Sequence, residues 1–218
     1  MIGDGAGAVI LRRQDKDEKC FGMEIVYTRM NSVGLGKKPG MFLPGGGSLR
    51  PFCQDALKEG LQYFKHDYRE VLLHGPELYL RAIQDTFDAN NIGFDDIDVY
   101  VPHQANGRVP YLASKMGVPE ERVFFNFPKV GNTANASTLL CLDEIDRKNE
   151  VPTGGLVLLL GAESTKWLYS SILLRWSPLV GEQRSVVQKR SRSIFERMYR
   201  FIIFWLLLWF VRIKRLFM

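Results

Sequence analysis

The sequence predicts a layered α/β domain in which helices cover a mixed β-sheet. Short apolar runs alternate along the chain with segments of helical spacing, and this alternation is typical of the α/β class. The chain has 218 residues, of which 46% are hydrophobic and 24% charged. These are ordinary globular values, so a disordered or fibrous protein is excluded. The length is sufficient for one domain, or two small ones, with a core that needs no disulfides.

Six segments are predicted to be strands, because each is a short apolar run bounded by charged or turn-forming residues. They are residues 7–11, 23–27, 99–101, 123–125, 156–160 and 168–176. The run 156–160 is apolar at every position, as expected for a central strand buried on both faces. We expect the first two strands to pair through the charged turn at residues 14–19.

Helices are predicted where apolar residues recur at helical spacing. They are residues 55–68, a helix that begins at Pro76 and includes Phe87, and residues 109–116 and 135–147. Pro76 is placed at a helix start because proline is favoured in the first turn. Residues 31–51 are rich in glycine and proline and predict a long loop that forms a lid or an entrance wall.

The cysteines and the first residues indicate the compartment. Cys20, Cys53 and Cys141 are odd in number and have no metal-like spacing, which argues against a disulfide framework. A reducing, cytoplasmic compartment is therefore predicted. The opening residues Met1–Gly5 lack the basic and apolar regions of a secretory signal, in agreement with this prediction.

Charge divides the chain into two regions, a body over residues 1–178 and a tail over residues 179–218. Residues 182–218 carry nine Lys or Arg and two Glu, a net charge of +7 within a total of +5. The remainder is therefore slightly acidic, and the high pI does not indicate that the body binds nucleic acid.

The tail contains eleven uncharged apolar residues at 201–211, whereas a helix needs about 20 to span a membrane. Tryptophans with flanking arginines favour an amphipathic helix over about 194–218 that lies peripherally on the inner face of a membrane. Three alternatives stay open: a helix packed on a partner subunit, non-native sequence, and a full crossing with snorkelling arginines.

Two short segments carry the polar residues of a candidate site. Val101–Asn106 places a histidine directly after a predicted strand, and Gly131–Ser137 opens a predicted helix with small polar residues. Strand ends and helix starts of this kind face the ligand crevice of α/β sheets. On the simpler interpretation, the histidine is structural and the asparagines are helix caps.

In this order, the two segments resemble the C-terminal half of β-ketoacyl-acyl-carrier-protein synthase III, of the thiolase-like superfamily. The segment Gly3–Val9 and the closing strand pair Leu156–Trp176 resemble the same family, so the resemblance covers about residues 1–176. It implies one thiolase-like half, layered αβα around a mixed five-stranded sheet. The basic, apolar tail helix would follow this half.

The resemblance also implies roles for individual residues. His103 and Asn132 match the pair that holds the thioester carbonyl of malonyl-acyl-carrier protein while CO₂ is lost, and Asn106 matches a neighbouring asparagine with a supporting hydrogen bond. Arg108 and Lys115 match positions that meet the acidic carrier protein, and a solvated helix face is the alternative for both.

The segment Ser164–Lys166 stands where family members often have three glycines, one of which completes an oxyanion hole. The backbone N–H of Thr165 is the candidate for that role. The resemblance implies no metal and no bound cofactor, with acyl-coenzyme A and acyl-carrier-protein thioesters as substrates. The implied assembly is a homodimer or heterodimer.

No cysteine of this chain has the glycine-flanked, strand-to-helix setting of the family's nucleophile, which lies in the N-terminal half. The first hypothesis is therefore an acyltransferase part whose cysteine lies on a separate, N-terminal polypeptide. The second is an inactive truncated remnant or a scaffold subunit. The third is a decarboxylase or hydrolase that uses the His–Asn pair without covalent catalysis.

Overall fold

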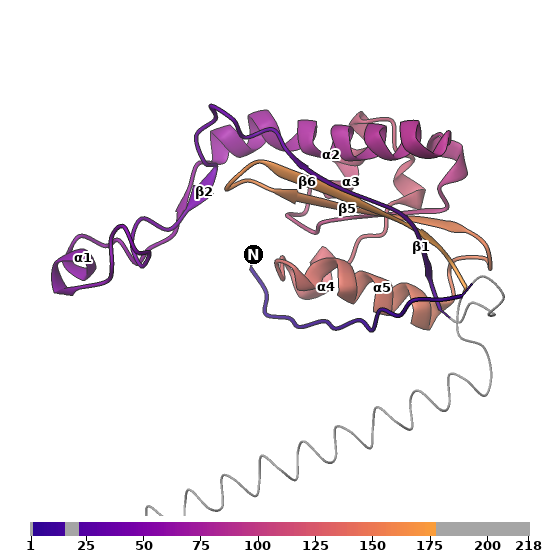
Figure 1. The fold of residues 1–218 in the computed structure, drawn as a ribbon, viewed down its shortest axis with the longest axis horizontal. Coiled ribbons are helices and arrows are strands. Elements are labelled where there is room, and N and C mark those ends of the chain that lie inside the picture. The colour runs from indigo at the N-terminus through magenta and orange to yellow at the C-terminus, as the bar shows by residue number, and fades with distance from the viewer. Residues whose placement is uncertain (1, 16–21, 178–218) are drawn as a thin grey trace, which may run out of the picture. The chain divides into compact units, whose positions relative to one another are not determined.

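The computed structural model describes residues 2–15 and 22–177, and a four-stranded mixed sheet lies at its centre (Figure 1). The strand order is β1-β6-β5-β4. The four strands are β1 (Glu24–Ser32), β6 (Leu168–Arg175), β5 (Leu156–Glu163) and β4 (Val99–Pro102). Strand β6 is antiparallel to both β1 and β5, whereas β4 and β5 are parallel. The sheet is therefore mixed, as predicted.

Helices cover both faces of the sheet (Figure 1). The α-helices are α1 (Gln54–Lys58), α2 (Tyr68–Asn90), α3 (Val109–Lys115), α4 (Phe127–Val130) and α5 (Ala136–Lys148), and two short 3₁₀ helices are η1 (Phe94–Asp96) and η2 (Glu120–Arg122). Helices α2 and α3 lie on one face, and α4 and α5 lie on the other. This is the layered αβα arrangement that the sequence predicts.

The first five residues of β5, Leu156–Leu160, are all apolar because this strand contributes to both cores. Leu158 and Leu160 are buried in the cluster shared with α2, whereas Val157 and Leu159 are buried in the cluster shared with α5. Successive side chains of a strand point to opposite faces, so a strand between two helical layers needs apolar residues throughout. The prediction of a central, doubly covered strand at 156–160 is confirmed.

The sheet has four strands and not the five that were predicted. The run 7–11 is not a strand, and Ile10 is 96% exposed. Strand β1, which starts at Glu24, pairs with β6 instead. Gly7 passes so close to α5 that an added Cβ would lie 2.6 Å from the Leu139 side chain. Residues 123–125 form a single bridge from Val123 to Tyr100, not a ladder.

Helix α2 begins earlier than predicted. The Asp67 carboxylate accepts hydrogen bonds from the backbone N–H groups of Arg69 and Glu70 at 3.1 and 3.2 Å, which caps the helix at this point. Pro76 therefore lies inside a 23-residue helix, and its prediction as a first-turn residue is wrong. The cap supplied by Asp67 is the stronger start signal.

The region predicted as one helix over 55–68 is divided. Helix α1 ends after one turn, where Gly60 adopts a positive φ of 72°, and the chain then enters β3 (Lys65–His66). Strand β3 pairs with β2 (Met41–Phe42), and together they form a ribbon that carries α1 (Figure 1). The predicted loop over residues 31–51 is confirmed except at two places, the last residues of β1 and strand β2.

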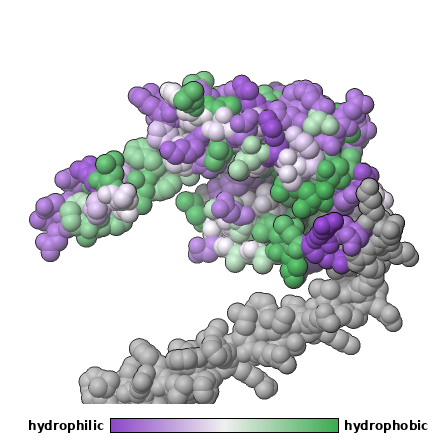
Figure 2. Space-filling model, in the orientation of Figure 1, coloured by the Kyte–Doolittle hydropathy of each residue, from purple (hydrophilic) through white to green (hydrophobic). Residues whose placement is uncertain are grey.

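Several large apolar side chains are exposed on the ribbon with α1 and on residues 2–11 (Figure 2). They include Ile2, Ile10, Leu49, Phe52 and Tyr63. Contiguous exposed apolar surface often marks a contact with another protein.

The predicted tail over 179–218 lies outside the described residues, and so do Cys20 and the predicted interfacial helix. The boundary between body and tail stays a prediction. Within the described ranges, the helices lack the combination of length and hydropathy that a membrane crossing requires.

The location of the core predicts that alanine substitution lowers the free energy of unfolding far more at a buried leucine than at an exposed one. Leu158→Ala should lower the free energy of unfolding by about 2–5 kcal/mol, because Leu158 is fully buried between the sheet and α2. Leu73→Ala, at an exposed position of α2, should change it by less than about 0.5 kcal/mol. Urea unfolding of both variants measures the difference, and equal losses would contradict the proposed core.

Candidate active site

His103 lies where β4 ends. The parallel pairing of β4 with β5 continues past Pro102, because the His103 N–H donates to the Leu160 carbonyl at 2.7 Å. On the other side, the Tyr79 hydroxyl donates to the His103 carbonyl at 3.3 Å. The backbone of His103 is thus held by the sheet and by α2, which makes the position of its side chain well defined.

The neighbouring Gln104 supports this position from the core. It is fully buried, and its Nε2 donates to the carbonyls of Pro102 and Phe124 at 2.8 and 3.2 Å. Its Oε1 accepts the Asn126 N–H at 3.2 Å. Gln104 therefore ties the end of β4 to residues 124–126. It was not among the predicted site residues, because a glutamine in a loop gives no signal in one sequence.

The His103 imidazole contacts the start of α5. Its Nδ1 lies 2.9 Å from Oγ of Ser137, the second residue of that helix. The ring is half-buried, and burial lowers the pKa of His103 because the charged imidazolium loses solvation. The lowered pKa favours the neutral ring near pH 7, and a neutral imidazole carries one N–H donor.

The Asn132 side chain is hydrogen-bonded to the loop that follows β4. Its Nδ2 donates to the Ala105 carbonyl at 3.3 Å, and its Oδ1 accepts the Ala134 N–H at 2.9 Å. These two contacts set the orientation of the carboxamide and leave one N–H of Nδ2 unused by them. The predicted segments Val101–Asn106 and Gly131–Ser137 therefore meet through two side-chain contacts, from His103 to Ser137 and from Asn132 to Ala105.

Asn106 has a different contact from the one predicted. Its Oδ1 accepts the Arg108 N–H at 2.8 Å, which organises the turn into α3. The described residues show no hydrogen bond from the Asn106 side chain to His103 or Asn132. A direct supporting role at the pair stays a prediction.

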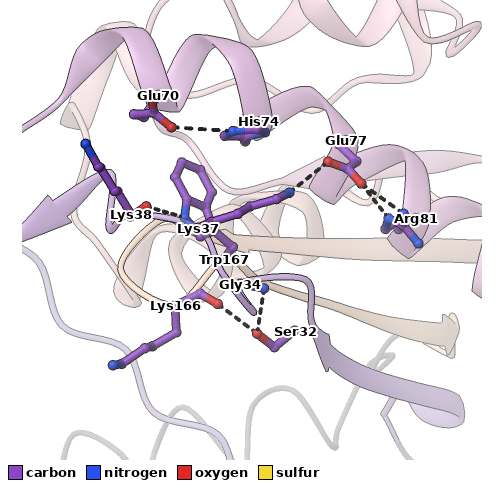
Figure 3. Close-up of polar contacts among 10 residues, drawn as sticks. All are labelled: Ser32, Gly34, Lys37, Lys38, Glu70, His74, Glu77, Arg81, Lys166 and Trp167. Atoms are coloured by element: carbon purple, nitrogen blue, oxygen red, sulfur yellow. Dashed lines mark hydrogen bonds and ion pairs between the residues drawn. The ribbon is translucent and has the colours of Figure 1, made fainter.

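Thr165 lies in the turn between β5 and β6. Its N–H donates to the Glu163 carboxylate, so the predicted oxyanion donor is already engaged. The turn is held from outside by hydrogen bonds from the Ser32 hydroxyl to the Lys166 carbonyl at 2.8 Å and from Trp167 Nε1 to the Lys38 carbonyl at 2.7 Å (Figure 3). Among the described residues, no hydrogen bond joins Thr165 to His103 or Asn132.

Arg108 and Lys115 stand at opposite ends of α3. Arg108 is the N-cap residue, Lys115 is in the last turn, and both are exposed. The Lys115 ammonium lies 5.4 Å from the centre of the Tyr111 ring. The exposed face of α3 therefore presents two positive charges and an aromatic ring.

The two described cysteines differ in their surroundings. Cys53 is exposed, and its sulfur accepts the Ala56 N–H at the start of α1. Cys141 is buried within α5, and burial, with a smaller contribution from Glu144, raises the pKa of its thiol to about 12. A thiol with this pKa is not ionised near neutral pH, so Cys141 is a core residue. Nor do the described residues gather three metal-ligating side chains in one place.

Comparison with known proteins identifies a family that this chain resembles. Residues 87–176 match the family model described as 3-oxoacyl-[acyl-carrier-protein] synthase III C terminal. A β-ketoacyl-[acyl-carrier-protein] synthase III of Chlorobaculum tepidum is 29% identical over 177 residues, which cover 81% of this chain and 52% of the relative. The corresponding protein of Rhodopirellula baltica is 33% identical over 191 residues, which cover 81% of this chain and 54% of the relative.

Solved structures agree with these sequence relatives. The crystal structure of 3-oxoacyl-(acyl carrier protein) synthase III from Pseudomonas aeruginosa has a TM-score of 0.63 and 25% identity, covering 78% of this chain and 49% of that chain. The chain thus spans about half the length of the relatives it matches. The described residues correspond to the C-terminal half of a β-ketoacyl-acyl-carrier-protein synthase III-like, thiolase-fold enzyme.

Proposed function

We propose that this chain is the C-terminal part of a 3-oxoacyl-[acyl-carrier-protein] synthase III-like acyltransferase. It works with a Cys-bearing N-terminal half, supplied by a separate or sister polypeptide, in the decarboxylative Claisen condensation of fatty acid or related acyl biosynthesis. The observation that carries this proposal is the contact between the two site segments, from His103 to Ser137 and from Asn132 to Ala105. The complex is cytoplasmic, and the tail attaches it peripherally to a membrane.

The chemistry follows from two neutral donors at one site. Decarboxylation of a malonyl thioester breaks the bond to the carboxylate carbon and releases CO₂. The electron pair moves toward the thioester carbonyl, whose oxygen becomes an enolate oxygen. An imidazole N–H of His103 and the unused amide N–H of Asn132 donate to that oxygen. Donors held in position before the reaction stabilise the charge as it develops.

The enolate carbon then attacks an acyl group carried as a thioester on the cysteine of the other half. The new carbon–carbon bond forms as the sulfur leaves as a thiolate, so the N-terminal half supplies the covalent intermediate and this chain supplies the enolate site. Acyl-coenzyme A or acyl-carrier protein brings the acyl group. Neither step requires a metal or a redox cofactor from this chain.

A second candidate is an inactive remnant or a scaffold subunit of a condensing enzyme. The exposed apolar residues of the α1 ribbon and of residues 2–11 favour it, because such surface binds other chains without any chemistry. The two candidates differ in whether mixing this chain with a Cys-bearing half restores catalysis.

Complementation tests the proposed reaction directly. The chain should release CO₂ from malonyl-acyl-carrier protein and form a 3-oxoacyl product when it is mixed with the N-terminal half of the Chlorobaculum tepidum relative. His103→Ala and Asn132→Ala should each lower the rate by about 100–1,000-fold, because each removes one donor to the enolate oxygen. His66→Ala, at an exposed histidine of β3, is the matched control.

An inactive mixture, when the intact relative is active in the same assay, would contradict the acyltransferase proposal and favour the scaffold. Release of CO₂ by this chain alone would indicate a decarboxylase that needs no cysteine.

Carrier-protein binding tests the proposed surface of α3. Arg108→Ala and Lys115→Ala should each weaken the affinity for acyl-carrier protein by about two- to fivefold, the scale of an exposed ion pair, and more so at low salt. Arg147→Ala is the control, because Arg147 is an equally basic, exposed residue of α5 that pairs with Asp143. Titration with labelled carrier protein measures the three affinities. Equal losses in all three variants would contradict a specific surface on α3.

The lowered pKa of His103 predicts how stability depends on pH. Above about pH 6.5, the ordinary pKa of histidine, His103 is neutral in both the folded and the unfolded chain. Below it, the unfolded chain binds a proton that the folded chain resists, so the free energy of unfolding falls as the pH falls. Urea unfolding between about pH 7.5 and about pH 5.5 should show a smaller loss in His103→Ala than in the unmodified chain. An equal loss of unfolding free energy in the variant and in the unmodified chain would show that burial of His103 does not cause the pH dependence.

A further inference from the structure

The contact between His103 and Ser137 bears on which ring nitrogen of His103 carries the hydrogen. The Ser137 side chain is fully buried, whereas the His103 ring is half-buried at the surface of the site. The distance of 2.9 Å from Nδ1 to Oγ is that of a hydrogen bond. The donor in this bond is either the ring nitrogen or the hydroxyl, and the two choices give histidine different tautomers.

Counting hydrogens decides between the two choices. If Nδ1–H donated to Oγ, the hydroxyl hydrogen of Ser137 would need another acceptor. Among the described residues, His103 is the hydrogen-bond partner of this hydroxyl, and a buried hydroxyl has no access to water. Buried polar hydrogens are almost always paired, so the hydroxyl donates and Nδ1 accepts.

We propose that Ser137 is a positioning residue whose hydroxyl donates to Nδ1 of His103 and thereby holds the ring hydrogen on Nε2. The inference rests on the proposed function in one respect: Nε2–H is then the donor to the enolate oxygen. Nε2 makes no hydrogen bond to any described residue, so its hydrogen is available to a substrate. Desolvation of the ring disfavours the doubly protonated form, which agrees with this assignment.

The position of Ser137 in the fold explains why it serves this purpose. It follows Asn132 by five residues, and the turn between them has Ala134 at a positive φ of 50°. That turn directs Asn132 to the Ala105 carbonyl and Ser137 to the imidazole. One short segment therefore supplies the second donor and sets the tautomer of the first.

The tautomer is measured by ¹⁵N NMR of the full chain with labelled histidine, which distinguishes protonated from unprotonated ring nitrogens without any catalytic assay. The chain has three histidines, so removing each in turn assigns the signals. His103 is expected to carry its hydrogen on Nε2 near pH 7. In Ser137→Ala, the spectrum should move toward a mixture of tautomers or toward Nδ1–H. Ser137→Thr retains a hydroxyl and should restore Nε2–H.

Two controls separate positioning from folding. Ser114→Ala removes an exposed hydroxyl of α3 and should leave the His103 spectrum unchanged. Unchanged signals of His66 and His74 in Ser137→Ala would show that the fold persists. An Nδ1–H tautomer in the unmodified chain, or an unchanged tautomer in folded Ser137→Ala, would overturn the inference.

In the complementation assay, Ser137→Ala should lower kcat by about 10–100-fold with little change in KM. This is the scale seen when the group that orients a metal-binding histidine is removed. Nε2–H in the spectrum with no activity in the mixture would overturn the proposed function but leave the tautomer assignment intact. Full activity in a Ser137→Ala variant with an altered tautomer would overturn the positioning role.

Discussion

The contact between the loop after β4 and the start of α5 is the constraint on which the candidate site depends. The backbone of His103 is held by the sheet, and Asn132 lies in the turn that precedes α5, so the candidate site needs both parts of the fold. The hydrogen bonds from Asn132 to Ala105 and between Ser137 and His103 join the two elements at their ends. In the proposed reaction, these contacts hold both donors in place before charge develops.

Much of the fold was predictable because the central elements follow simple patterns. The continuous apolar run at the start of β5 and the helical spacing of α3 and α5 required no knowledge of tertiary structure. The errors lie where tertiary contacts decide. Residues 7–11 have the composition of a buried strand, but Gly7 packs against α5 and β1 takes the place beside β6. Pro76 resembles a helix start, yet the cap of Asp67 and the packing of α2 on the sheet include it in a longer helix.

The candidate site was predictable only in part, and by resemblance more than by pattern. His103 and Asn132 lie in segments that the structure brings together, but a histidine after a strand is not by itself a signal of catalysis. Ser137 and Gln104 were missed because one resembles a helix-start serine and the other a loop residue, and their roles arise from partners distant in sequence. The error at Thr165 is of the opposite kind, because a role was predicted that the local contacts do not favour. The Thr165 N–H was expected to be free, but it donates to the nearby Glu163 carboxylate.

Burial has three linked effects at His103. Removal of water disfavours the imidazolium, which lowers the pKa of the ring and keeps it neutral. The same loss of water leaves the Ser137 hydroxyl without a solvent acceptor, which directs its hydrogen to Nδ1. A hydrogen bond in this less polar environment is also stronger than one in water, so Nε2–H would stabilise an enolate more effectively here. In the proposed reaction, the neutral ring is therefore the form of His103 that donates to the enolate oxygen.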